Sequence, residues 1–245
     1  MGLYVEARIR ADLDDLWART QEPSLHQRWD LRFTEIDHLA RVEGEPRRFW
    51  YATRVLPGLT IAGTGISAGE KERLDGTRTS ALRFASPHPL SLLAEGSGYW
   101  RYVPDGEGIR FLTGYDYRPR WGRPGALADR LLFRPLMGWA TAWSFDRLRL
   151  WLERDITPEE ALRRWIAEAA VRALTVVAAC AGPAYGALVD PAGVLAPLAL
   201  FATPVAAVPA ALFVPPLPGT PSARRCLRTP PPRARAPRLL ATLKG

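Results

Sequence analysis

One stretch of this chain constrains its fold more than any other, because the 51 residues between Arg172 and Arg224 carry a single charge, on Asp190. Soluble domains almost never contain so long an uncharged run. We therefore predict a transmembrane helical hairpin over residues 173–217, with segments 173–189 and 191–217. Arginines flank the stretch on both sides, at Arg163, Arg164 and Arg172 before it and at Arg224, Arg225 and Arg228 after it. This bias predicts that both ends lie on the cytoplasmic side of the cell membrane.

Prolines complicate this interpretation. Seven of them fall within residues 173–217, where each removes a backbone donor that lipid cannot replace. A disordered Ala/Pro-rich tail and a soluble helical extension therefore remain as alternatives. Residues 156–172 are expected to form a linker or juxtamembrane helix. Residues 218–245 are basic and rich in proline, and we expect a disordered tail that touches anionic lipid.

The net charge of +8 is distributed unevenly. Residues 1–165 contribute 25 basic minus 23 acidic residues, or +2, residues 166–223 contribute −1, and residues 224–245 contribute +7. A near-neutral domain with a basic end favours an anionic membrane over nucleic acid as the partner. The N-terminus lacks the basic and apolar regions of a secretion signal, so residues 1–155 are expected in the cytoplasm. Cys180 and Cys226 form neither a disulfide framework nor a CxxC motif.

The first 155 residues have the pattern of an α+β domain. Apolar and polar residues alternate from Leu3 to Arg10, which predicts a strand, and short helices are expected after Asp12 and from Pro23 to Trp29. Six alternating segments follow in meander order, separated by residues typical of turns. Their ranges are 31–40, 47–56, 59–68, 77–85, 97–103 and 108–117. A long helix with a kink at Pro135 is predicted over residues 125–153.

Three segments carry a resemblance to a known family. They are VEARIRADLDDLWARTQEPSLHQRWD at 5–30, SGYWRY at 97–102 and RLLFRPLMGWATAWSFDRLRLWLE at 130–153. Residues 1–155 resemble the SRPBCC superfamily, also called START-like or polyketide cyclase/dehydrase-like. The resemblance implies a helix-grip fold, in which an antiparallel sheet wraps around a long C-terminal helix and an apolar ligand lies between them.

The run RPLMGWATAWSFDRLR is more narrowly similar to bacterial proteins in which such a domain is fused to a DoxX-like membrane region. DoxX-like regions usually have about four spanning helices. Only 80 residues follow Trp165 in this chain, which puts a complete DoxX-like module in doubt.

No catalytic, metal or cofactor motif is convincing. Gly65-Ile66-Ser67-Ala68-Gly69 fits GxSxG, but a charged hairpin end rather than a helix follows it. The three histidines, at positions 26, 38 and 88, lack the spacing of metal ligands. We therefore predict no cofactor and no metal site.

Large rings gather on the strands and on the long helix. Strand parity places the side chains of one face together, and helical spacing places others on the facing stripe. We predict that the following residues line a cavity for an apolar ligand: Trp100, Tyr102, Phe111, Thr113, Tyr115, Tyr117, Leu136, Trp139 and Trp143. The alternative is that these rings only fill the core.

The sequence thus favours a membrane-tethered START-like module that binds a lipid, an isoprenoid or a polyketide-like molecule, with no catalytic residue. Two alternatives stay open. A polyketide cyclase/dehydrase-like enzyme could use Tyr115, Tyr117, Arg83 or Glu95, and a subunit of a DoxX-like redox assembly rests on the resemblance alone. Protein partners are not predicted.

Overall fold

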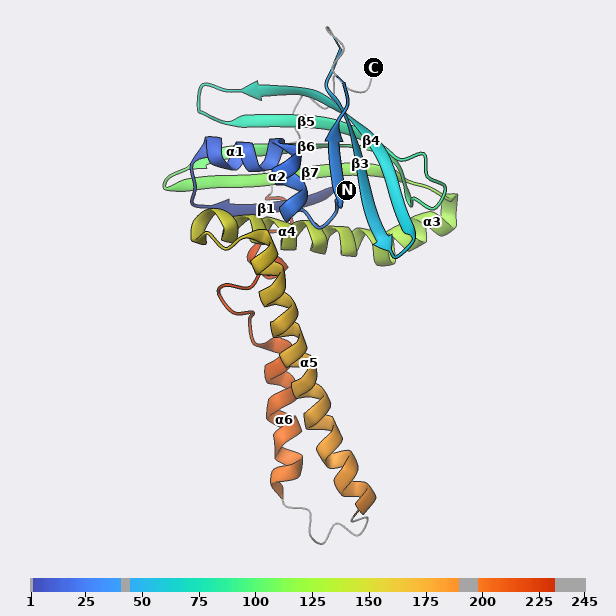
Figure 1. Ribbon diagram of the computed structural model, residues 1–245, viewed down its shortest axis with the longest axis vertical. Helices are drawn as coiled ribbons and strands as arrows, with labels where there is room; N and C mark the ends of the chain where they lie inside the picture. The colour runs from blue at the N-terminus through green and yellow to red at the C-terminus, as the bar shows by residue number, and fades with distance from the viewer. Residues whose placement is uncertain (1, 41–44, 190–197, 232–245) are drawn as a thin grey trace. The chain divides into compact units, whose positions relative to one another are not determined.

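The chain folds into two units. The computed structural model describes residues 2–40, 45–189 and 198–231. Unit 1 combines residues 1–158 with residues 222–245, and unit 2 comprises residues 159–221. Figure 1 colours the strands and first helices of unit 1 from blue to green and the two long helices of unit 2 in gold and orange.

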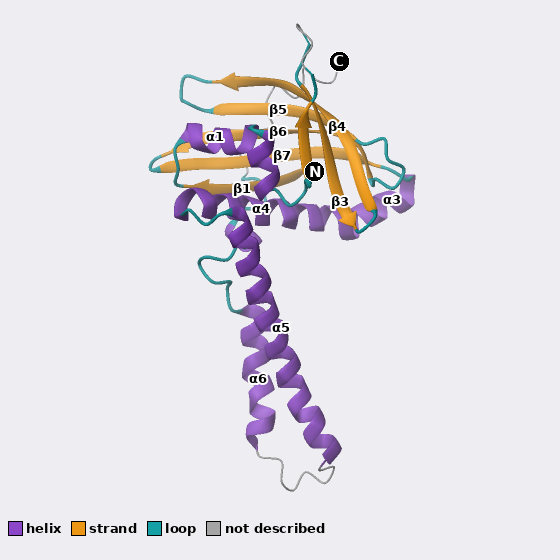
Figure 2. Cartoon of the chain, viewed as in Figure 1, coloured by secondary structure: helices purple, strands orange, loops and turns teal. Residues whose placement is uncertain are grey.

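Unit 1 contains an antiparallel sheet of seven strands in the order β1-β7-β6-β5-β4-β3-β2, drawn in orange in Figure 2. Strands β2 to β7 follow one another as neighbours, so the predicted meander is confirmed, and β1 closes against β7. The strands are β1 (Leu3–Ile9), β2 (Glu35–His38), β3 (Arg48–Leu56), β4 (Leu59–Glu72), β5 (Arg78–Ala85), β6 (Leu93–Asp105) and β7 (Gly108–Pro119).

The helices of unit 1 follow local signals in the sequence. Helix α1 (Leu13–Gln21) starts at Asp12, whose side chain accepts hydrogen bonds from the amides of Asp14 and Asp15; this is a standard N-cap. Helix α2 (Pro23–Trp29) has proline in its first turn, where no amide donor is needed. The predicted α+β order of one strand, two small helices, six strands and a long helix is therefore confirmed.

The predicted long helix is present, but its irregularity differs from the expected kink. Helix α3 (Gly122–Ala128) leads into a π-helix, η1 (Asp129–Phe133), and then into α4 (Arg134–Arg154). Pro135 lies in the first turn of α4. Proline cannot donate a hydrogen bond to the carbonyl four residues before it. The wider π turn immediately before Pro135 accommodates this missing hydrogen bond.

The core of unit 1 lies between one face of the sheet, here called the inner face, and helices α1, α2 and α4. The ring of Phe111 on β7 stacks on Phe145 of α4 at 4.4 Å, and Trp29 of α2 lies 6.2 Å from Trp100 of β6. Tyr102 and Phe111 are fully buried. Burial of each such ring stabilises the fold by about 1.5–3 kcal/mol.

At four points an aromatic ring lies against a glycine of the neighbouring strand, and three of these contacts are the tightest. Phe49 pairs with Gly65, Tyr51 with Gly63 and Phe84 with Gly96. A Cβ atom at Gly63, Gly65 or Gly96 would lie 2.4, 2.0 or 2.5 Å from the opposite ring. Only glycine fits these positions, because any side chain would collide with the ring.

Within the tail predicted over 218–245, residues 222–227 pack against unit 1 rather than forming a disordered segment. Leu227 and Glu6 exchange two backbone hydrogen bonds of 2.9 Å, so the segment pairs with β1 at the edge of the sheet. The short 3-10 helix η2 (Ala223–Arg225) precedes this pair and contacts α4. Hydrophobicity patterns missed it because the pairing is made across more than 200 positions of sequence. Residues 232–245 lie outside the described residues.

Unit 2 contains α5 (Pro158–Val189) and α6 (Leu198–Phe213). Arg172 of α5 pairs with Glu168 at 2.6 Å and also donates to the carbonyl of Ala211 at 2.8 Å. Helix α5 covers residues 158–172 of the predicted linker or juxtamembrane helix at 156–172.

Within the described part of the chain, no helix is both long enough and apolar enough to cross a membrane. The structure therefore does not support the two predicted crossings over 173–217. Asp190 and the rest of the predicted turn fall outside the described residues.

Candidate functional site

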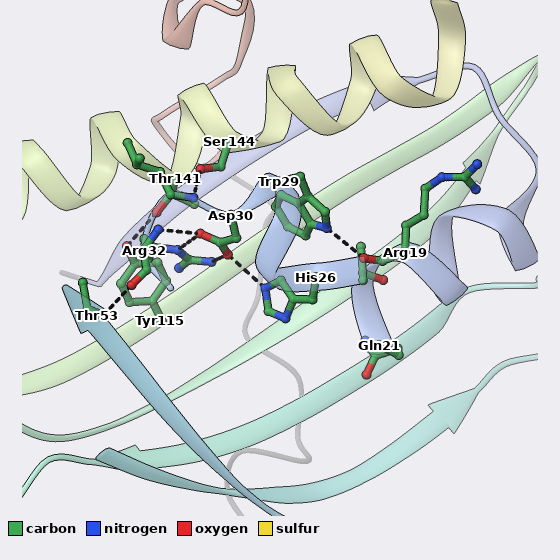
Figure 3. Close-up of polar contacts among 12 residues, drawn as sticks. Arg19, Gln21, His26, Trp29, Asp30, Arg32, Thr53, Tyr115, Thr141 and Ser144 are labelled. Carbon is green, nitrogen blue, oxygen red and sulfur yellow. Dashed lines mark hydrogen bonds and ion pairs between the residues drawn. The ribbon is translucent and has the colours of Figure 1, made fainter. Parts of the chain in front are cut away.

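A cluster of charged side chains is buried beside the inner face. Arg32 donates from Nε to Asp30 Oδ1 at 2.9 Å and from Nη2 to Asp30 Oδ2 at 2.6 Å. His26 Nε2 lies 3.0 Å from Asp30 Oδ2. The side chain of Asp30 is fully buried, and those of Arg32 and His26 are only 10% and 12% exposed. Figure 3 shows the three side chains converging under α4.

Local structure puts these residues together. His26 lies in the last turn of α2, and Asp30 is the residue that caps the end of this helix, so the two side chains are four positions apart on one face. The chain then turns toward β2. Two contacts fix the turn: Leu31 donates its amide to Ser144 Oγ of α4 at 2.9 Å, and Thr53 of β3 donates to the Arg32 carbonyl at 2.5 Å.

The cluster is surrounded by rings. His26 stacks on Trp29 at 5.0 Å and meets the edges of Trp100 and Phe33 at 4.8 and 5.3 Å. The Arg32 guanidinium lies 5.5 Å from the centre of the Tyr115 ring. An ion pair in such surroundings is poorly solvated, so its mutual hydrogen bonds determine whether it is stable.

Electrostatics keep the pair charged and the histidine neutral. Burial alone would raise the pKa of Asp30, but the Arg32 charge and its hydrogen bonds hold that pKa well below its usual range. Burial also opposes the charge on Arg32, whereas Asp30 raises the pKa of the guanidinium. Burial lowers the pKa of His26 in spite of its contact with Asp30. At neutral pH the cluster therefore holds one anion, one cation and a neutral imidazole.

Two tyrosines extend the polar contacts along β7. The hydroxyls of Tyr115 and Thr141 on α4 lie 3.0 Å apart. Tyr117 donates to Asp129 Oδ1 at 2.5 Å, and Arg134 pairs with the other oxygen of Asp129 at 3.1 Å. Both tyrosines are buried. The inner face thus carries hydroxyl groups and rings side by side, which suits a ligand with an apolar body and a polar end.

Six of the nine predicted cavity residues lie together on the inner face, as strand parity predicted. Trp100 pairs with Thr113 and Tyr102 with Phe111 across β6 and β7. Tyr115 and Tyr117 of β7 complete the group of six, and all six side chains are buried. Whether they contact a ligand stays a prediction.

The three predicted residues of α4 lie elsewhere. Leu136 is 52% exposed. Trp139 and Trp143 stack on one another, and Arg147 lies over Trp143. Thr141 and Phe145, which do meet the sheet, stand about half a turn away from them on the helix. Whether these three side chains contact a ligand also stays a prediction. The pattern does not single out one stripe, because α4 is apolar on several sides and the segment at 222–227 also packs against it.

Sequence reasoning missed the charged cluster. Asp30 and Arg32 are close in sequence, but no pattern shows that the loop after α2 turns inward. Thr141 was also missed, because a single hydroxyl within an apolar helix gives no periodic signal. For His26 the sequence suggests only metal binding, and its spacing to the other histidines does not fit that role. Among the described residues, no group of three His, Cys, Asp or Glu side chains could hold a metal ion.

A surface recess of about 220 Å³ lies between α1 and the strands β2 and β4. It is lined by Gln21, His38, Arg47, Ser67 and Glu70. Gln21 donates to the hydroxyl of Tyr102 at 2.9 Å, so this polar recess reaches a residue of the inner face.

Comparison with known proteins gives one close sequence relative. The chain is 50% identical over 162 residues to the uncharacterized membrane protein YndG of Bacillus subtilis (strain 168). The match covers 66% of this chain and 60% of the relative, so the chain spans less than two thirds of the relative's length. No family model matches the chain.

Several solved structures are similar in part. A STAR-related lipid transfer protein from Xanthomonas axonopodis has a TM-score of 0.46 and 18% identity, covering 61% of this chain and 84% of that chain. A START superfamily protein from Mycobacterium smegmatis has a TM-score of 0.41 and 13% identity, covering 56% and 91%. The Zhui aromatase/cyclase from Streptomyces sp. R1128 has a TM-score of 0.41 and 15% identity, covering 61% and 96%.

Proposed function

We propose that this protein is a START-like module that binds an amphipathic small molecule and acts at a membrane. The apolar body of the ligand lies along the rings of the inner face, and its polar end meets Arg32 and Tyr115. The observation that carries the proposal is the charged cluster of His26, Asp30 and Arg32, buried among those rings.

The energetics of the cluster support a role beyond stability. Replacing a buried ion pair by apolar side chains of similar volume is often neutral or stabilising. A contribution to stability is therefore a poor explanation for the presence of the buried Asp30–Arg32 ion pair. A guanidinium held by one carboxylate and placed beside a tyrosine ring is well suited to orient a polar or anionic end of a ligand.

The inner face must open for a ligand to enter. Phe111, Phe145 and Trp100 pack against one another at 4.4 and 5.9 Å, so binding requires these rings to separate. The π-helix η1 precedes α4, and its wider turn makes this region a suitable place for such movement.

Membrane association rests on three observations. The sequence relative bears the name of a membrane protein, residues 173–223 contain one charge, and residues 224–245 contribute +7. Together they favour a chain held at an anionic membrane. The DoxX-like redox assembly has no further support.

Native mass spectrometry of the full chain, purified in mild detergent, tests the binding function. We expect a lipid, isoprenoid or other amphipathic molecule to be retained by the wild type and lost in Arg32→Gln. Arg118→Gln is the matched control, because Arg118 forms an exposed pair with Glu95; this variant should retain the ligand. A wild type that retains no ligand and takes up none from a lipid extract would refute the proposal.

A cyclase-like reaction is the second candidate, favoured by one feature. His26 is neutral and lies 3.0 Å from Asp30, so its imidazole can accept a proton. Assay of a poly-β-keto model compound with wild type and His26→Gln tests this. Equal turnover in the two proteins would remove His26 from any such mechanism.

A further inference from the structure

The segment from Trp121 to Leu136 reverses the usual distribution of side chains in a surface helix, because its apolar side chains are exposed and its acidic side chain is buried. Its leucines point outward: Leu127 is 59% exposed, Leu131 and Leu132 are 69% exposed, and Leu136 is 52% exposed. Its acid points inward, since Asp129 is only 4% exposed and is bound by Tyr117 and Arg134. Figure 1 shows α3 leading into α4 at one end of the sheet. A buried carboxylate beside a row of exposed leucines indicates a binding surface.

Trp121 adds a large ring to the same surface. Its backbone has a φ of 67°, which is unfavourable for a bulky residue. Its indole donates to the carbonyl of Pro89 at 3.1 Å, and the side chain remains 49% exposed. We call the side chains of Trp121, Leu127, Leu131, Leu132 and Leu136 the leucine face.

The charge around the leucine face is positive. Residues 120–136 contain four arginines and one acid, Asp129, or +3. Asp129 is buried and already paired with Arg134, so it does not offset Arg123 and Arg130, which are exposed. Outward positive charge beside outward leucines matches a surface that is both apolar and anionic.

We infer that the leucine face docks into the interface of an anionic lipid bilayer. The leucines enter the boundary between head groups and acyl chains, Trp121 lies at the level of the head groups, and Arg123 and Arg130 meet lipid phosphates. This contact belongs to unit 1 and is separate from the uncharged stretch of the chain.

A row of ring contacts leads from the helical segment of the leucine face to the candidate site. Phe133 of η1 meets the ring of Tyr117 at 5.8 Å, Tyr117 stacks on Tyr115 at 6.4 Å, and Arg32 lies over Tyr115. This row of side chains connects the leucine face with the charged cluster. This step rests on the proposed ligand function: with the leucine face docked, the ligand comes from the bilayer and enters unit 1 at η1.

Environment-sensitive fluorescence tests the docking on the full chain. Leu132→Cys, labelled with an NBD group in a Cys180→Ser/Cys226→Ser background, reports on the leucine face. Leu74→Cys is the matched control, because Leu74 is fully exposed in the turn between β4 and β5. Vesicles of phosphatidylcholine are compared with vesicles that also contain phosphatidylglycerol.

We expect the label at position 132 to shift to the blue and to become accessible to quenchers in the acyl chains only with anionic vesicles, while the label at position 74 does not change. Arg123→Gln/Arg130→Gln should weaken the response by about tenfold or more. No shift at 132 on vesicles that bind the chain, or a shift that depends on protein concentration without lipid, would overturn the inference. Ligand retention in native mass spectrometry is a separate readout, so either proposal can fail alone.

Discussion

Single residues of the buried cluster differ in what they contribute. Asp30 holds Arg32 with two hydrogen bonds and also meets His26. Because all three are buried, loss of one partner leaves another without compensation for its desolvation. Removing one charge of the pair and removing both charges should therefore affect stability differently, while both changes should abolish ligand binding.

Asp30→Asn removes the anion and leaves the Arg32 charge buried. We expect the free energy of unfolding to fall by about 3–5 kcal/mol, measured by urea denaturation of the full chain. Asp30→Leu/Arg32→Met removes both charges and should lie close to the wild type in stability while losing the ligand. If the double variant is as unstable as the single one, the pair is needed for folding and the argument for a binding role fails.

Stability should also depend on pH through His26. Its pKa is lowered in the folded state by burial, so below its unfolded value of about 6.5 the unfolded chain binds a proton that the folded chain does not. The folded state therefore loses stability as the pH falls from 7 to 5. His26→Gln should show a smaller loss over this window in thermal unfolding. An unchanged pH profile would assign the loss to other groups.

At the scale of elements, the segment after unit 2 completes unit 1. Asp146 of α4 is fully buried and accepts hydrogen bonds from the Ser222 amide at 2.7 Å, from Arg225 at 2.8 Å and from Arg149 at 2.7 Å. Burial raises the pKa of Cys226 to about 12, so its thiol stays protonated beside the carbonyl of Ala142. Residues 1–155 alone therefore lack two of the three partners of Asp146.

Truncation tests this element directly. A chain ending at Pro221 should lose about 1.5–3 kcal/mol of stability for each charged hydrogen bond removed from Asp146. A chain ending at Pro231 keeps Ser222, Arg225 and Leu227 and serves as the control. Equal denaturation midpoints for the two truncated chains would show that the segment does not stabilise unit 1.

For the molecule as a whole, the proposed attachment to a membrane is the feature to test. The proposal of an interfacial attachment rests on the leucine face of unit 1 and on the basic residues of 224–245.

Fractionation of cells that express the full chain tests the attachment. We expect the protein in the membrane fraction and its release by alkaline carbonate, because interfacial contacts are reversible. The variant Leu131→Ser/Leu132→Ser should shift part of the protein to the soluble fraction before the wash. Complete retention after carbonate would instead establish an integral segment and restore the predicted crossings.

The order of the elements in unit 1 and the parity of β6 and β7 can be predicted from the sequence alone. These features are local, since alternation, N-caps and turn residues act over a few positions of chain. The inward turn of Asp30 and Arg32 cannot be predicted in this way, because it depends on contacts with Ser144 and Thr53, which are distant in sequence. The pairing of Leu227 with Glu6 is distant in the same sense. The outward leucines of 127–136 could not be predicted either, because their exposure depends on which side of an apolar helix packs against the sheet.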